Sequence, residues 1–207
     1  MFDVAFKDVQ FVLIMGFVFI IWAMLSFLNP PAQEDMAEPP GNVAVHIEWP
    51  PGDTDVDLWV TGPGETRPVG YSNKSGRLWN LLRDDLGLRP DATPSNHENA
   101  YTRGLVPGEY IVNVHCYNCP SIPVVVDVEV SVKQEDSSGT MVNGKKPIDI
   151  KIIVTTSVTL RFNKHEKTAV RFRLTSDGDL VPDSVNHIYH KIKGGQTSNH
   201  LGDAGDE

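Results

Sequence analysis

Three aspartates, Asp53, Asp55 and Asp57, stand at alternate positions in one short stretch of the chain. Alternate residues of a β-strand lie on the same face, so the pattern predicts that Asp55 and Asp57 share a face opposite to that of Val56. Hard oxygen donors gathered in this way suit Ca²⁺. Further side chains that could complete the coordination follow later in the sequence: Asp84, Asp85, Asn96 and Glu98. In the alternative interpretation, the aspartates only cap turns and form hydrogen bonds at a sheet edge.

Cys116 and Cys119, the two cysteines of the chain, form a C-x-x-C motif at the end of an alternating apolar stretch. A redox motif of this kind normally begins a helix, whose N-terminus stabilises the thiolate. Here a turn and another strand are expected to follow, which favours a disulfide between the two cysteines over oxidoreductase activity. His115 would add a third zinc ligand, but the sequence offers no matching second pair.

Another carboxylate, Asp8, stands just before an apolar run from Val9 to Leu28 in which only Gln10 and Ser26 are strongly polar. A helix of about 20 apolar residues is long enough to cross the bilayer core. The full length of this run and the absence of a small-residue cleavage site favour an uncleaved transmembrane helix over a signal peptide. An ionised carboxylate at the end of such a span needs a partner or water. Either Asp8 has a functional role, or it reaches headgroups and water from the interface.

The segment Ala5-Phe6-Lys7-Asp8-Val9, followed by Val12-Leu13-Ile14, resembles the start of the transmembrane helix in the ExbD, TolR and MotB family, in which an aromatic residue, one variable residue and an aspartate precede the apolar helix. Trp22 matches a tryptophan further along the MotB helix. The resemblance implies that Asp8 carries the transported ion, H⁺ or Na⁺. It also implies a homodimer inside a pentamer of polytopic subunits of the MotA, ExbB or TolQ type. The cytoplasmic part is shorter than is usual in the family, and nothing after the helix looks like the family's periplasmic domains.

The net charge of −9 and the lack of a Lys/Arg cluster argue against binding to nucleic acid or to anionic lipid. Lys7 precedes the apolar run and acidic residues follow it, so residues 1–8 are expected in the cytoplasm and residues 9–28 in the membrane. The remainder would then lie in the periplasm of a bacterium, anchored in the inner membrane. Residues 29–41 form a Pro-rich linker, either a semi-rigid stalk or a disordered connector.

From residue 42 to residue 175, apolar side chains alternate with polar ones, most cleanly from Val124 to Val132. This pattern predicts a periplasmic domain that is an antiparallel β-sandwich. A long insertion is expected from Tyr71 to Arg103, with a short helical turn at Leu78–Leu82. Residues 176–207 are expected to form a flexible tail, with a brief helix at Val185–Ile192.

The strand that contains Asp55 and Asp57, together with Pro107-Gly108-Glu109-Tyr110, resembles a family of uncharacterised bacterial β-sandwich domains with an Asp-x-Asp-Leu strand. That resemblance implies no particular activity. The sequence contains no nucleophile elbow, phosphate-binding loop or HExxH pair, so we expect a binding module rather than an enzyme.

Two functions remain open. The chain is either a subunit of an ion-driven motor whose β domain engages an envelope protein or glycan, or an anchored periplasmic binding module. In the second case the module could be Ca²⁺-dependent and lectin-like, and the helix would be a plain tether.

Overall fold

The computed structural model describes residues 2–28, 41–87, 95–135 and 148–194. The chain divides into two compact units, residues 1–39 and residues 40–207. The predicted linker, residues 29–41, lies almost wholly outside the described residues. Each unit is therefore considered by itself.

The first unit contains one continuous helix, α1 (Phe2–Leu28). Its most apolar part, Phe6–Leu25, spans 20 residues, and none of this window is buried within the chain. A helix that is apolar all round needs lipid or another protein against it. By length and composition it can cross a membrane, and an N-terminal signal sequence would have the same character. The helix begins at Phe2, before the apolar run that starts at Val9. Asp8 therefore lies inside the candidate span Phe6–Leu25 and not before it.

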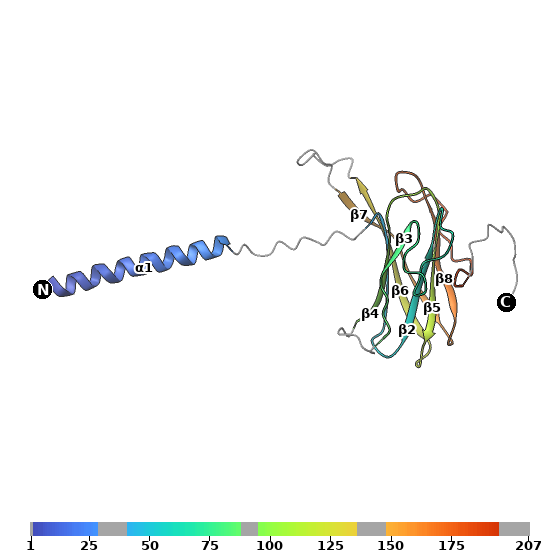
Figure 1. The fold of residues 1–207 in the computed structure, drawn as a ribbon, viewed down its shortest axis with the longest axis horizontal. Coiled ribbons are helices and arrows are strands. Elements are labelled where there is room, and N and C mark those ends of the chain that lie inside the picture. The colour runs from blue at the N-terminus through green and yellow to red at the C-terminus, as the bar shows by residue number, and fades with distance from the viewer. Residues whose placement is uncertain (1, 29–40, 88–94, 136–147, 195–207) are drawn as a thin grey trace. The chain divides into compact units, whose positions relative to one another are not determined.

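In the described part of the second unit, the regular secondary structure consists of β-strands. In chain order they are β1 (Val43–Trp49), β2 (Asp55–Thr61), β3 (Trp79–Arg83), β4 (Asn96–Thr102), β5 (Gly108–Asn118), β6 (Val124–Glu135), β7 (Ile148–Leu160) and β8 (Glu166–Leu174). They form two sheets, a five-stranded one in the order β3-β4-β1-β6-β7 and a three-stranded one in the order β2-β5-β8. Every pairing is antiparallel. Figure 1 shows the two sheets as facing layers, and the prediction of two packed antiparallel sheets is confirmed.

The core lies between the two sheets, where the alternating apolar residues meet. Val43, Val45 and Ile47 of β1 are buried, while the residues between them are partly exposed. From the other sheet, the ring of Tyr110 stacks on that of Phe172 with the two centroids 5.3 Å apart. Period-two patterning therefore marks the inward face of most strands.

The predicted insertion from Tyr71 to Arg103 is wrong. Strands β3 and β4 lie within it and form one edge of the five-stranded sheet. Residues 78–82 form no helical turn; instead Trp79 and Leu81 point inward and Leu82 is exposed, as a strand requires. Pairing with β4 decides the conformation of this segment.

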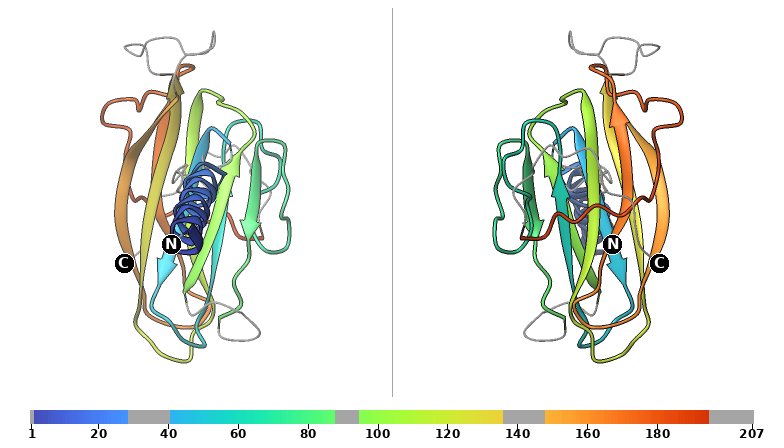
Figure 2. Two further views of the ribbon diagram at one scale, coloured as in Figure 1. Left: turned by 90° about the vertical axis from the view of Figure 1, so that its left-hand side faces the viewer. Right: turned by 90° about the vertical axis from the view of Figure 1, so that its right-hand side faces the viewer.

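The predicted boundary of the domain at residue 175 is too early. Residues 176–194, called the strap below, first run beside β8, where Leu180 and Asn186 form bridges to it, and then cross the outer face of the three-stranded sheet (Figure 2, right). No helix forms at Val185–Ile192; the backbone groups of Arg171 and Asn186 form a bridge instead. Ile192 is 1% exposed and packs with Trp59 and Ile111. Residues 195–207, the rest of the predicted tail, lie outside the described residues.

Candidate functional site

Strand β2 is buried on both faces, which is unusual for an edge strand of a sheet. Val56 and Leu58 enter the core between the sheets, as the alternation predicts. The opposite face carries Asp55, Asp57 and Trp59, which are buried as well. The Asp-x-Asp pattern therefore does share a face, but that face is covered by other parts of the chain. Carboxylates in such surroundings need hydrogen bonds or positive charge to compensate for lost water.

Glu98 of β4 reaches from the five-stranded sheet to the free edge of β2. Its side chain is completely buried. One carboxylate oxygen accepts a hydrogen bond from the backbone N–H of Leu58 at 2.7 Å, and the other accepts one from the N–H of Asp85 at 3.2 Å. Burial raises the pKa of Glu98 well above its ordinary value, although the two N–H groups act in the opposite direction. Glu98 thus links the two sheets through a buried carboxyl group.

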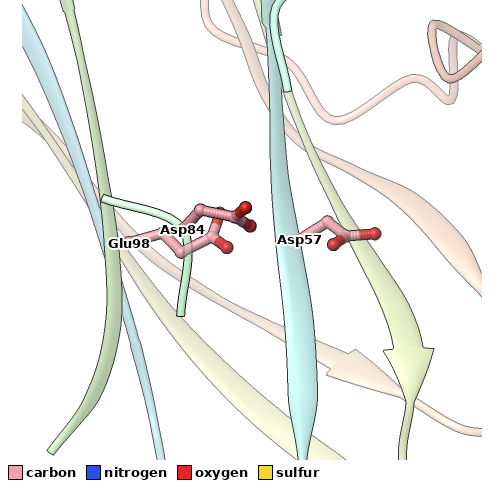
Figure 3. Close-up of side chains that lie close together, drawn as sticks. All are labelled: Asp57, Asp84 and Glu98. Carbon is pink, nitrogen blue, oxygen red and sulfur yellow. The ribbon is translucent and has the colours of Figure 1, made fainter. Parts of the chain in front are cut away.

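Asp57, Asp84 and Glu98 bring three carboxylates together at this edge (Figure 3). One oxygen from each residue lies within 4.8 Å of the other two. Figure 3 shows Asp84 and Glu98 side by side, next to the β2 ribbon that carries Asp57. Asp84 Oδ2 lies 2.7 Å from Nζ of Lys74, whereas Asp57 Oδ2 lies 2.8 Å from Nδ1 of His115. We call Asp57, Asp84 and Glu98 the acidic cluster.

Asp55 lies next to the acidic cluster, two residues before Asp57 on the same face of β2. Asp55 is 8% exposed, and within the described part of the chain its Oδ1 atom has no hydrogen-bond partner. Burial raises the pKa of Asp55 to about 7, and the negative charges of Asp57, Asp84 and Asp85 add to this increase. Burial and the neighbouring carboxylates thus disfavour the ionised form of Asp55 where no additional positive charge is supplied.

Three of the predicted ligands have other roles. Asp53 is exposed and lies outside the acidic cluster. Asp85 is buried, but its carboxylate binds Arg83 at 3.0 Å and accepts hydrogen bonds from the backbone N–H groups of Gly87 and His97. Asn96 donates its amide N–H groups to two backbone carbonyls, those of residues 50 and 52. The interpretation that the aspartates cap turns therefore fits Asp85, and Asn96 also holds a loop in place.

No pattern in the sequence indicated the two basic residues that lie beside Asp57, His115 and Lys193. His115 of β5 is buried; with its hydrogen on Nδ1 it donates to Asp57, and its Nε2 lies 2.6 Å from Nζ of Lys193. Lys193 belongs to the strap, and burial lowers its pKa from the ordinary value. His115 and Lys193 are 78 residues apart, so no local pattern could have paired them. His115 thus pairs with Asp57 on the side that faces the strap, and Lys193 contacts His115 in turn.

Glu65 is a second carboxylate that was not anticipated. It accepts hydrogen bonds from three consecutive backbone N–H groups, those of Arg77, Leu78 and Trp79, at 3.0, 2.7 and 2.8 Å. These bonds fix the start of β3, and β3 in turn positions Asp84 at its end. A single glutamate in a Gly- and Pro-rich turn carries no sequence signal for this role.

The remaining predicted sites lie elsewhere. Cys116 and Cys119 are joined by a disulfide at the end of β5, so neither is a free thiol or a zinc ligand in this structure. Asp8 is exposed on α1. Comparison of the chain with protein families, with characterised proteins and with solved structures finds no match.

Proposed function

We propose that the chain is a single-pass subunit of an ion-driven motor of the ExbD, TolR and MotB type, with Asp8 as the ion-carrying carboxylate. The observation that carries this proposal is the position of Asp8 on α1. It is the only acidic residue in the candidate span Phe6–Leu25, and the helix continues without a break on both sides of it. An ionisable residue inside a span marks a functional site by default.

The surroundings of Asp8 on the helix support a role with other subunits. Positions three, four and seven residues later share its face, and they carry Phe11, Val12 and Met15. None of these supplies a hydrogen-bonding partner. A carboxylate on an apolar face is stable in a membrane only beside a polar group or a water path from another chain. A ring of polytopic subunits would provide that path.

In the assembly that the family resemblance implies, two copies of α1 lie inside a pentamer of MotA-, ExbB- or TolQ-like subunits. The N-terminus lies in the cytoplasm of a bacterium and the β domain in the periplasm, where it engages an envelope protein or glycan. Each H⁺ or Na⁺ that crosses the inner membrane releases ~2.3 kcal/mol per 100 mV. The chain itself is then not an enzyme; it converts ion flow into movement.

The test compares Asp8→Asn, Asp8→Glu and Asp3→Asn in the native host at matched membrane abundance. Asn keeps the shape and polarity of the side chain but cannot titrate, so we expect Asp8→Asn to assemble with its polytopic partner and to conduct no ions in vesicles. Asp8→Glu keeps the titration and should retain partial flux. Asp3→Asn, outside the candidate span, is the matched control and should behave as wild type.

Assembly is measured separately from ion flux, by purification in mild detergent and imaging of the complex. A 5:2 stoichiometry is expected. Full ion flux and full cellular function in Asp8→Asn would contradict the motor and leave an anchored binding module, with α1 as a tether.

A further inference from the structure

We propose that the acidic cluster, Asp57, Asp84 and Glu98, binds one Ca²⁺ ion together with Asp55, at the edge of the sandwich where β2 meets β3 and β4. The proposal does not depend on the motor function. It rests on the geometry of the three carboxylates, on a buried oxygen without a partner, and on a route from solvent.

The spacing of the carboxylates suits Ca²⁺. One oxygen from each residue lies within 4.8 Å of the other two. The corners of a triangle with sides of that length lie about 2.8 Å from its centre, and Ca²⁺–oxygen distances are about 2.3–2.6 Å. Because 4.8 Å is the upper limit of the three separations, a contraction of at most a few tenths of an ångström would complete the contacts. Mg²⁺, which requires about 2.0–2.1 Å and near-ideal octahedral geometry, fits this spacing less well.

Two buried oxygens lack a donor at this place. Asp55 Oδ1 and Asp84 Oδ1 are inaccessible to solvent and have no hydrogen-bond partner within the described part of the chain. Asp55 is more than nine-tenths buried and lies close enough for the charges of Asp57 and Asp84 to act on it. A buried anionic oxygen without a partner is unfavourable, and a divalent cation held by the acidic cluster would supply positive charge close to both residues.

The neighbouring basic groups leave room for a cation. His115 contacts Asp57 from the strap side, and Lys193 in turn contacts the His115 ring; His115 therefore orients the carboxylate in the way that outer-sphere partners orient metal ligands. Lys74 pairs with Asp84, but the Lys74 side chain is 56% exposed, and an ion pair at the surface is weak. Lys74 can therefore yield to Ca²⁺. The Asp84 side chain, 16% exposed, provides the access from solvent.

The donor set also decides the class of metal. All four side chains offer carboxylate oxygens, which are the ligands of Ca²⁺ rather than of Zn²⁺. Asp57 belongs to the three-stranded sheet and Glu98 to the five-stranded sheet, with Asp84 directly after β3. A bound ion would join the two sheets at the free edge of β2, so binding should stabilise the fold.

The experiment uses the full chain in detergent micelles after removal of metal with EDTA. Titration calorimetry with CaCl2 measures affinity and stoichiometry, and tryptophan fluorescence follows thermal unfolding. Asp84→Asn is the main variant, because this residue is only partly buried and the fold should tolerate the change. Asp53→Asn is the matched control, since Asp53 lies in the same Asp-rich stretch but is exposed. Glu98→Gln is a second variant at a fully buried position.

We expect one Ca²⁺ per chain and a Tm that rises with CaCl2 concentration by mass action. Asp84→Asn should weaken binding tenfold or more and remove most of the rise in Tm, and Glu98→Gln, where it folds, should do the same. Asp53→Asn should match wild type, and MgCl2 should raise Tm less than CaCl2.

An unchanged Tm of wild type at about 10 mM CaCl2, above the range for extracellular Ca²⁺ modules, would overturn the proposal. So would equal affinities of wild type and Asp84→Asn, or an equal loss in Asp53→Asn. An equal effect of Mg²⁺ would overturn the assignment to Ca²⁺. None of these results depends on Asp8, so failure of the motor proposal would be seen separately.

Discussion

Replacing Ile192 by alanine tests whether the strap is part of the folded domain. The sequence predicted a flexible tail from residue 176, and in a flexible tail this change would have almost no effect on stability. In the structure Ile192 is 1% exposed and fills a small apolar cluster with Trp59 and Ile111, against which Tyr71 packs. The substitution would leave a cavity between the strap and the outer face of β2 and β5.

The size of the effect follows from this burial. Truncation of a buried isoleucine to alanine costs about 2–5 kcal/mol, depending on how far the surroundings relax into the cavity. The strap lies on the surface of the sheet and can move inward, so we expect the lower end, about 2–3 kcal/mol. For a domain of this size, that corresponds to a decrease in Tm of roughly 5–10 °C.

Urea unfolding of the full chain in micelles, followed by tryptophan fluorescence, measures this loss, and Trp59 reports on the site directly. Ile188→Ala is the matched control: it is the same change in the same segment, but Ile188 is 67% exposed. The control should cost less than about 0.5 kcal/mol. Equal effects of the two substitutions, or no effect of Ile192→Ala, would show that the strap does not pack as described.

Two further predictions concern the same face of the domain. Gly70→Ala should destabilise the fold, because a Cβ atom there would lie 2.5 Å from the Trp59 ring, whereas Gly104→Ala, with open space around it, should be tolerated; equal midpoints of urea unfolding for the two would contradict this. The second prediction concerns pH. The pKa of Asp55 is raised from 3.8 to about 7 by burial and by neighbouring carboxylates, so between these values the folded state binds more protons than the unfolded state. Stability of the metal-free protein should therefore fall as pH rises from about 4 to about 7, by at most about 1.4 kcal/mol per pH unit from this group. Asp55→Asn should flatten the dependence measured by urea unfolding in EDTA, and an unchanged slope would refute the role of Asp55.

The sequence by itself predicted the elements whose signals are local. An unbroken apolar run of about 20 residues favours a helix in an apolar environment. This preference depends on the composition of the run itself and not on contacts with the rest of the chain. Alternation of apolar and polar residues marks the inward faces of strands such as β1 and β6, because the side-chain period of a strand is two. The shared face of Asp55 and Asp57 follows from the same period.

Local patterns failed where pairing with a distant segment decides the conformation. A helical turn was predicted at Leu78–Leu82, but the segment pairs with β4 and forms the strand β3. The strap showed no clear period, and it is held by hydrogen bonds such as the one from Asn113 to the carbonyl of His190 at 2.8 Å. Contacts of this kind depend on the packing of whole sheets and leave no periodic trace in sequence.

The choice among the acidic residues was made only by the tertiary structure. From the sequence, Asp53 and Asp85 were as good candidates as Asp57 and Glu98, because residue type and spacing do not tell which carboxylates converge. The carboxylate of Glu98 accepts a hydrogen bond from Leu58 of β2, a residue 40 positions earlier in the chain. This contact forms because β4, in the five-stranded sheet, lies opposite the edge of β2. On this edge of β2, Val60 pairs with Val69, whereas the backbone N–H of Leu58 needs another acceptor. A buried glutamate from the facing sheet supplies it. The same packing places Asp84 beside it and exposes Asp53.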